Sequence, residues 1–142
     1  MASANNFKGY RLVSRDVREL AAIFAGGAAG AVARVLIARH VGSGAPNWPW
    51  STFLINISGT FLLGYFATRL QERLPLSRYR RPLLGTGFCG AYTTFSTFQV
   101  ELLRMIEGGR LWFAVLYAGS SIAAGLVAVT IATAGVRRVR VL

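Results

Sequence analysis

The sequence has few of the residues from which most catalytic and metal sites are built. Its 142 residues include one cysteine, one histidine and five acidic residues. A single cysteine excludes an internal disulfide framework, and a lone histidine argues against a metal or thiol–imidazole site. Five carboxylates also leave little material for acid–base catalysis, and we expect Cys89 to be a small packing residue. The composition therefore does not favour an enzyme.

Polar stretches are also scarce, and this sets the class of protein. The chain is 54% hydrophobic with a mean hydropathy of +0.46 and a net charge of +11, which is too apolar for a soluble domain of this length. The basic residues form short clusters that flank apolar runs, as they do in proteins anchored and oriented in a membrane. We therefore predict an all-α membrane protein and no nucleic-acid partner.

Four apolar spans are expected, at residues 20–39, 51–68, 83–106 and 111–135, each near the ~20 residues that cross a bilayer. They form one transmembrane domain, residues 20–142. Residues 1–19 are a basic extension whose apolar positions suit a helix lying on an anionic membrane, or a disordered segment. Asp16 and Glu19 resemble a helix N-cap and its partner. Ala31-Val32-Ala33 has the form of a signal cleavage site, but a glycine-rich core and three further spans argue against cleavage.

The third span does not resemble an ordinary membrane helix. Three glycines precede a run of hydroxyl residues, and both features weaken a regular helix; the residues are Gly85, Gly87, Gly90, Thr93, Thr94, Ser96 and Thr97. Broken backbone is tolerated in lipid only where protein or a water-filled path covers it. The stretch therefore indicates either an ion site at a helix break or a close helix contact made by small residues.

The first span carries an arginine within the membrane. Gly26 and Gly30 form a GxxxG step that allows close helix approach, and Arg34 lies one turn further along the same face. An intramembrane arginine is costly unless it is paired. Arg34 is therefore expected either to have a structural or vestibule role or to extend to the membrane interface.

Two other spans carry isolated polar residues. Asn56 is the one strongly polar residue of the second span, and its amide can bond a neighbouring helix or donate to an anion. Tyr117 and Ser121 lie one turn apart on the fourth span. Their hydroxyls form either a polar track or interhelical hydrogen bonds.

Phe95, Phe98 and Glu101 share one face if the third helix resumes after its break. Glu101 lies near the end of the span. It is expected to be a vestibule residue or an ordinary exposed carboxylate beside Arg104.

Together these motifs resemble the Fluc/CrcB family of fluoride channels. The segments are GGAAGAVAR (26–34), NISGTFLLG (56–64) and GFCGAYTTFSTFQVE (87–101). The resemblance covers all four spans in order, and the TTFSTF run is its most specific part. It implies an antiparallel, dual-topology dimer of four-helix subunits with two fluoride pores and a central structural sodium ion.

The resemblance also implies roles for individual residues. Gly90 and Thr93 would give backbone carbonyls to the sodium ion at the break. The fluoride pathway would comprise Asn56, Phe95, Phe98, Tyr117, Ser121 and Glu101. This agrees with the chemistry, because fluoride is strongly hydrated and a selective path must replace water with hydrogen-bond donors and positive ring edges.

The distribution of charge bears on topology. One side carries 12 basic residues (four in the N-terminus, five in the second connector, three in the tail), and the other carries 3. A chain that inserts both ways should have little bias. The alternatives are a homodimer and a heterodimer with an oppositely oriented paralogue, in either case in the inner (plasma) membrane of a bacterium.

Two other functions are considered. A small multidrug-type dual-topology transporter also has four spans, but it relies on a carboxylate in the first span, and residues 20–39 contain none. A membrane-anchored protein that docks acidic partners through its N-terminus is the other.

Overall fold

The computed structural model describes residues 17–41, 48–72 and 78–138. Within these ranges the regular structure is entirely helical. Three helices are long and apolar enough to cross a membrane: α1 (Val17–Val41), α2 (Trp50–Glu72) and α5 (Leu111–Arg138). The interfacial helix and the Asp16 cap predicted for the N-terminal extension fall outside the described residues. The prediction of an all-α membrane protein is confirmed.

Each of these helices is longer than its predicted span. The apolar runs mark only the part of a helix that faces lipid, and helical backbone continues into the polar residues at either end. The start of α2 is set by Pro49, whose carbonyl accepts the N–H of Phe53 at 3.0 Å. The turn before α5 contains Gly109 at a φ of +72°, a conformation that glycine adopts at little cost.

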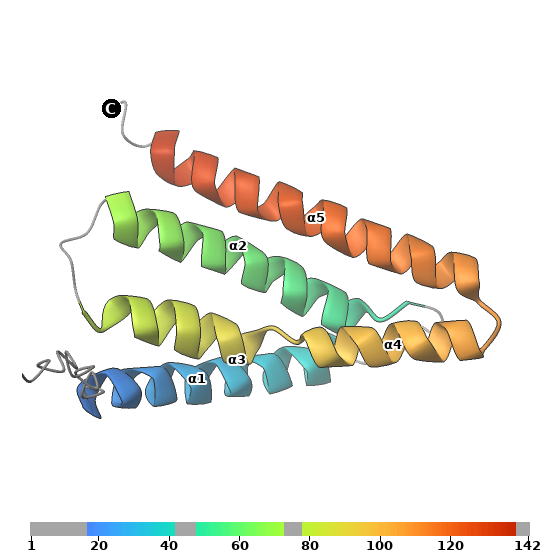
Figure 1. Cartoon of the computed structure of the whole chain (residues 1–142), viewed down its shortest axis with the longest axis horizontal. Helices are drawn as coiled ribbons and strands as arrows, with labels where there is room; N and C mark the ends of the chain where they lie inside the picture. The colour runs from blue at the N-terminus through green and yellow to red at the C-terminus, as the bar shows by residue number, and fades with distance from the viewer. Residues whose placement is uncertain (1–16, 42–47, 73–77, 139–142) are drawn as a thin grey trace, which may run out of the picture.

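The third span consists of two helical halves (Figure 1). The first half is η1 (Pro82–Cys89), wound with the wider π-type hydrogen bonding, followed by α3 (Gly90–Tyr92). The second half is α4 (Phe95–Glu107). The predicted break is therefore present, at the two residues between α3 and α4.

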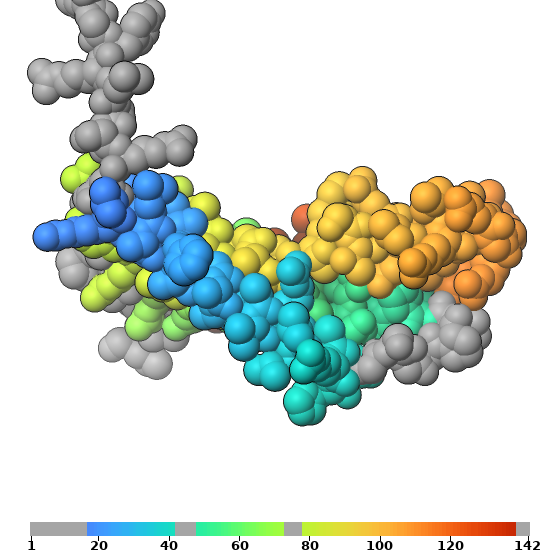
Figure 2. Space-filling view, turned by 90° about the horizontal axis from the view of Figure 1, so that it is seen from below, coloured from blue at the N-terminus to red at the C-terminus, as the bar shows by residue number. Residues whose placement is uncertain are grey.

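The four crossings, α1, α2, the third span (η1, α3 and α4) and α5, run in alternating directions (Figure 1). The main contacts of α1 are with η1 and α3, and those of α2 are with α5. Seen from below, α1 lies over the first half of the third span and leaves α4 uncovered on that face (Figure 2). The break thus lies where α1, α2 and the third span meet.

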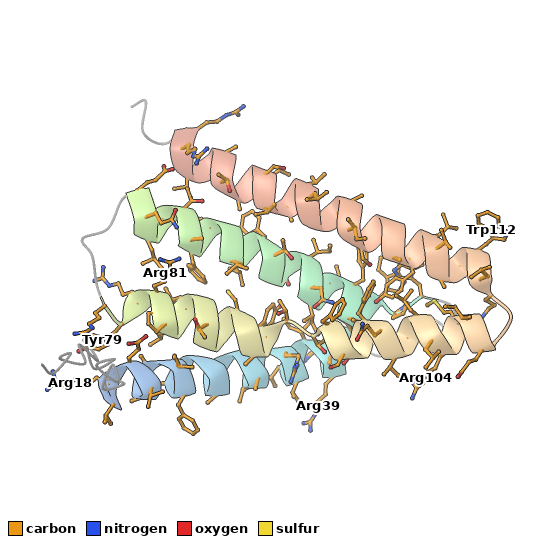
Figure 3. The ribbon with its side chains drawn as sticks, in the orientation of Figure 1. Arg18, Arg39, Tyr79, Arg81, Arg104 and Trp112 are labelled. Atoms are coloured by element: carbon orange, nitrogen blue, oxygen red, sulfur yellow. The ribbon has the colours of Figure 1, made fainter. Side chains whose placement is uncertain are left out.

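Large apolar side chains point outward along the bundle. Phe24 and Trp112 are each 79% exposed, and Trp112 projects away from the start of α5 (Figure 3). Such a surface suits contact with lipid, because lipid chains solvate apolar side chains as well as a protein interior does.

Candidate functional site

The break in the third span is formed by Thr93 and Thr94, whose ψ angles are 158° and 110°. The hydroxyl of Thr93 donates to the carbonyl of Cys89 at 3.0 Å and closes the end of α3. The hydroxyl of Thr94 accepts the backbone N–H of Thr97 at 3.3 Å and caps the start of α4. The hydroxyl run therefore provides the ends of the two half-helices.

Glycines on α1 and η1 allow these two helices to pack closely against each other. A Cβ atom on Gly26 or Gly30 would collide with the backbone carbonyls of Leu83 and Phe88 in η1. A Cβ on Gly87 would lie 3.0 Å from the backbone nitrogen of Gly27 in α1. The close helix contact is therefore present at Gly87, whereas a Cβ on Gly85 or Gly90 would meet no described atom within 4 Å. The helix break is present at the threonines, and an ion site there stays a prediction.

Asn56 of α2 holds the extended backbone at the break. Its Nδ2 donates to the carbonyl of Thr94 at 3.1 Å, and its Oδ1 accepts the N–H of the same residue at 2.9 Å. One turn further along α2, Gly59 packs against the methyl group of Thr93 and the ring of Tyr92. The amide has a second N–H on Nδ2, so Asn56 can hold the break and still donate once more.

Arg34 reaches the same point from α1. Its Nη1 lies 3.5 Å from the carbonyl oxygen of Thr93, at the outer limit of a hydrogen bond. The residue is half-buried beside the break, which favours a structural or vestibule role. Because a guanidinium stays protonated, it places a fixed positive charge near the break.

A groove of about 400 Å³ opens beside the break. Phe95 and Phe98 stack along its wall with ring centroids 6.1 Å apart, and Phe95 is 69% exposed. The hydroxyl oxygen of Ser121 is buried and has no hydrogen-bond partner among the described residues. The other lining residues are Asn56, Gly59, Thr60, Leu63, Gly85, Cys89, Gly90, Thr93 and Ile122. The groove thus brings together residues from α2, α5 and both halves of the third span.

Glu101 lies inside the bundle and binds two hydroxyl groups. Thr52 of α2 donates to its Oε1 at 2.6 Å, and Tyr117 of α5 donates to its Oε2 at 2.8 Å. Tyr117 is fully buried. The alternative of an exposed carboxylate beside Arg104 does not fit this position. The carboxylate instead joins α2, α4 and α5.

Tyr117 and Ser121, expected to share one polar track, have different surroundings. Ser121 lines the groove, whereas the Tyr117 hydroxyl is bonded to Glu101. Phe98 connects the two places, since it lines the groove and its ring centroid lies 5.2 Å from that of Tyr117. The predicted residues therefore form two adjoining groups, one at the groove and one around Glu101.

Two residues of this second group were missed by the sequence analysis. Thr52 lies one helical turn before Asn56, so the two share a face of α2, and this spacing was the signal available. Trp48 packs edge-on against Tyr117 with ring centroids 5.2 Å apart. Its signal was weaker, because a tryptophan next to a proline also marks an ordinary membrane interface.

Comparison with known proteins identifies the family. A family model described as CrcB-like protein, Camphor Resistance (CrcB), matches residues 21–133. The chain belongs to the CrcB family. The match begins in α1 and ends in α5, so it covers the groove, the break and the Glu101 group.

Several curated CrcB relatives carry the name of a fluoride channel. "Fluoride-specific ion channel FluC 1" of Mycolicibacterium paratuberculosis is 58% identical over 92% of this chain and 98% of its own length. The protein of the same name from Mycobacterium bovis is 58% identical over 90% and 97%, respectively. "Fluoride-specific ion channel FluC" of Acidobacterium capsulatum is 47% identical over 73% and 84%. The similarity thus extends over nearly the whole length of some relatives.

Proposed function

We propose that this chain is a passive, fluoride-selective channel that exports fluoride from the cytoplasm and so lowers its toxicity. Its CrcB relatives are named fluoride-specific ion channels. One structural observation carries the proposal. At the helix break, one groove is lined by the amide of Asn56, the rings of Phe95 and Phe98, and the hydroxyl of Ser121, which has no hydrogen-bond partner in the described part of the chain.

These groups suit a small, strongly hydrated anion. Leaving water is costly for fluoride unless other donors replace the lost hydrogen bonds. The second N–H of Asn56 and the hydroxyl of Ser121 are such donors, and the positive edges of the Phe95 and Phe98 rings add a weaker attraction. Arg34 adds positive potential from beside the groove. Each contact is modest, which allows the ion to leave again.

Glu101 and Tyr117 extend the pathway beyond Phe98. A bare carboxylate would repel an anion, but two hydroxyl donors share the negative charge of this one. The main effect of the Glu101 carboxylate is to fix the Tyr117 ring against Phe98. In this proposal the Glu101 group shapes the far end of the path, and the groove supplies the donors.

The channel is proposed to be an antiparallel dimer of four-helix subunits, with the third span counted as one broken crossing. Two features favour a second subunit. The groove is open along one side, where Phe95 is 69% exposed. A Cβ atom added to Gly90 would meet nothing within 4 Å, so a partner could approach closely there.

A structural sodium ion is proposed at the dimer centre, held by the carbonyls of Gly90 and Thr93. The chemistry fits, because carbonyls at a broken helix suit a hard cation. The N–H of Thr94 is bonded to Asn56, so it does not satisfy the Gly90 carbonyl, its usual helical acceptor. Arg34 near the Thr93 carbonyl opposes a cation. Carbonyls from two chains would offset that repulsion.

Membrane orientation follows from charge. Among the described residues, seven arginines lie at the end that holds the C-termini of α2 and α5, and three (Arg39, Arg104, Arg110) at the other. We propose two alternatives: a homodimer whose subunits insert in both orientations, or a chain whose basic end faces the cytoplasm of a bacterial inner membrane and which pairs with an oppositely oriented paralogue. Reporter fusions at the C-terminus test this. Activity on one side alone requires an oppositely oriented paralogue, and activity on both sides supports a dual-topology homodimer.

The decisive experiment is fluoride efflux from liposomes that contain the purified chain, measured with a fluoride electrode and compared with chloride. We expect rapid, fluoride-selective efflux that Phe95→Ile and Asn56→Asp suppress. Phe24→Ile is the matched control, because it removes another exposed phenylalanine, on α1 and outside the groove. Its efflux should equal that of the wild type.

Three results would contradict the proposal. Equal loss of fluoride efflux in Phe24→Ile and Phe95→Ile would show that the groove has no specific role in conduction. Efflux that requires a proton gradient, with a hydrophobic cation as the preferred substrate, would instead support a multidrug-type transporter. If the folded protein shows no efflux, it should be reconstituted together with a paralogue. No fluoride efflux from that mixture would contradict the channel.

A further inference from the structure

A second groove lies between the end of α2 and the start of η1. Its volume is about 330 Å³, and apolar side chains of α2 form one wall, among them Phe66, Ala67 and Leu70. Arg81 and Thr86 line the other side. Both are exposed, and Arg81 lies between the two helices at the end of the bundle (Figure 3). The groove thus combines an apolar wall with a cation and a hydroxyl donor.

The surrounding charge is strongly positive. Seven arginines occupy this end of the described chain: Arg18, Arg69, Arg78, Arg80, Arg81, Arg137 and Arg138. The described acidic residues there are Glu19 and Glu72, and Glu72 is paired with Arg137 at 3.0 Å. The groove is therefore complementary to an anion that also carries an apolar part.

We propose that this groove binds one anionic phospholipid, with its phosphate at Arg81 and Thr86 and the first part of an acyl chain against Phe66 and Leu70. A second copy of the chain has 5 acidic and 16 basic residues, so it would offer Arg81 few anionic partners. A free phosphate would leave the apolar wall uncovered. A basic pocket between helices at the cytoplasmic surface matches the chemistry of an anionic headgroup.

The lipid would fix the end of the third span. Arg81 directly precedes η1, so a phosphate held there ties the start of the broken helix to one leaflet. This role is structural, in a groove that shares Leu63 and Gly85 with the first one.

Native mass spectrometry of the full-length protein in a mild detergent tests the site. Phosphatidylglycerol and phosphatidylcholine with identical acyl chains are added at equal concentrations. We expect phosphatidylglycerol to be retained preferentially. Arg81→Gln should weaken its binding about fivefold, the effect of one arginine near an anionic headgroup, and Arg81→Lys should retain most of it. Ala67→Trp should also lower binding, because it fills the groove and keeps every charge.

Arg104→Gln is the matched control, since it removes an exposed arginine from the opposite end. It should leave lipid retention unchanged. Equal retention of the two lipids, or equal losses in Arg81→Gln and Arg104→Gln, would overturn the site. So would displacement of phosphatidylglycerol by an equal concentration of glycerol phosphate, which carries no acyl chain. The readout is binding, so failed fluoride efflux would not affect it.

Discussion

The two halves of the third span are held in place by different means. The first half, η1 and α3, packs through its backbone, with glycines of α1 against carbonyls of η1. The second half, α4, is held by side chains: Glu101 bonds to hydroxyls on α2 and α5, and Phe98 packs on Tyr117. One half is fixed against α1 and the other against α5. The break and its groove lie between them.

This division explains how a broken helix can be stable in a membrane. Extended backbone in lipid leaves N–H and C=O groups without helical partners, at a cost of several kcal/mol each. Here Asn56 pairs with both backbone groups of Thr94. These two bonds lower the cost of the break and hold the backbone beside the groove.

The largest expected effect tests the backbone packing of the first half. Gly26→Ala should destabilise the fold by about 3 kcal/mol or more, because its Cβ would collide with the carbonyl of Leu83. Gly27→Ala is the matched control, since its Cβ would meet nothing closer than 3.9 Å. Thermal unfolding in detergent should separate these adjacent substitutions. Equal melting temperatures would mean that the α1–η1 contact is not tight.

The next effect concerns the residue that joins the halves. Asn56→Leu should cost about 2 kcal/mol, because it leaves the N–H and C=O of Thr94 unpaired, and it should abolish fluoride efflux. Ser58→Ala, on the same helix, is the control, and removes a hydroxyl bonded to Leu54 and Tyr92. Its efflux should persist. Full efflux by Asn56→Leu would show that the break holds without its amide.

A smaller effect is expected in the second half. Glu101→Gln should destabilise the protein by about 1.5 kcal/mol, because one of its two hydroxyl donors, Thr52 or Tyr117, would lose its acceptor. Glu107→Gln should have no measurable effect, since Glu107 is exposed. A double-mutant cycle with Thr52→Val measures the coupling directly, and a value near zero would remove Thr52 from the group.

Much of this architecture could be predicted from the sequence, because its signals are local. Apolar runs mark α1, α2 and α5, and the glycine and hydroxyl run of the third span marks a break within a few residues. The sequence could not separate the roles of glycine and threonine there. That difference depends on which residues face α1. Because η1 is wound with π-type hydrogen bonds, each residue after Pro82 points in a different direction from the one it would have in an α-helix.

The partners of the polar residues were harder to predict. Asn56 is conspicuous as the one strongly polar residue of its span, but its bonds to the backbone of Thr94 join positions 38 residues apart. Thr52 and Glu101 are 49 residues apart, and the spacing of Thr52 from Asn56 places it on the same face of α2 but does not name its partner. Sequence patterns identify groups that need a partner. The packing of α2 against α4 and α5 decides which partner each one has.

The smallest expected effect concerns Gly109 in the turn after α4, where glycine is needed for its backbone conformation and not for close packing. Gly109 adopts a φ of +72°, and a Cβ there would meet no atom of the described residues within 4 Å, so the expected cost is conformational. Gly109→Ala should cost about 1 kcal/mol, and Gly109→Asn less, because asparagine tolerates the left-handed region. The melting temperatures of the two variants provide the comparison. If both melting temperatures fall as far as that of Gly26→Ala, the turn before α5 is packed tightly against a neighbour. Steric collision would then explain the need for glycine in both halves of the third span.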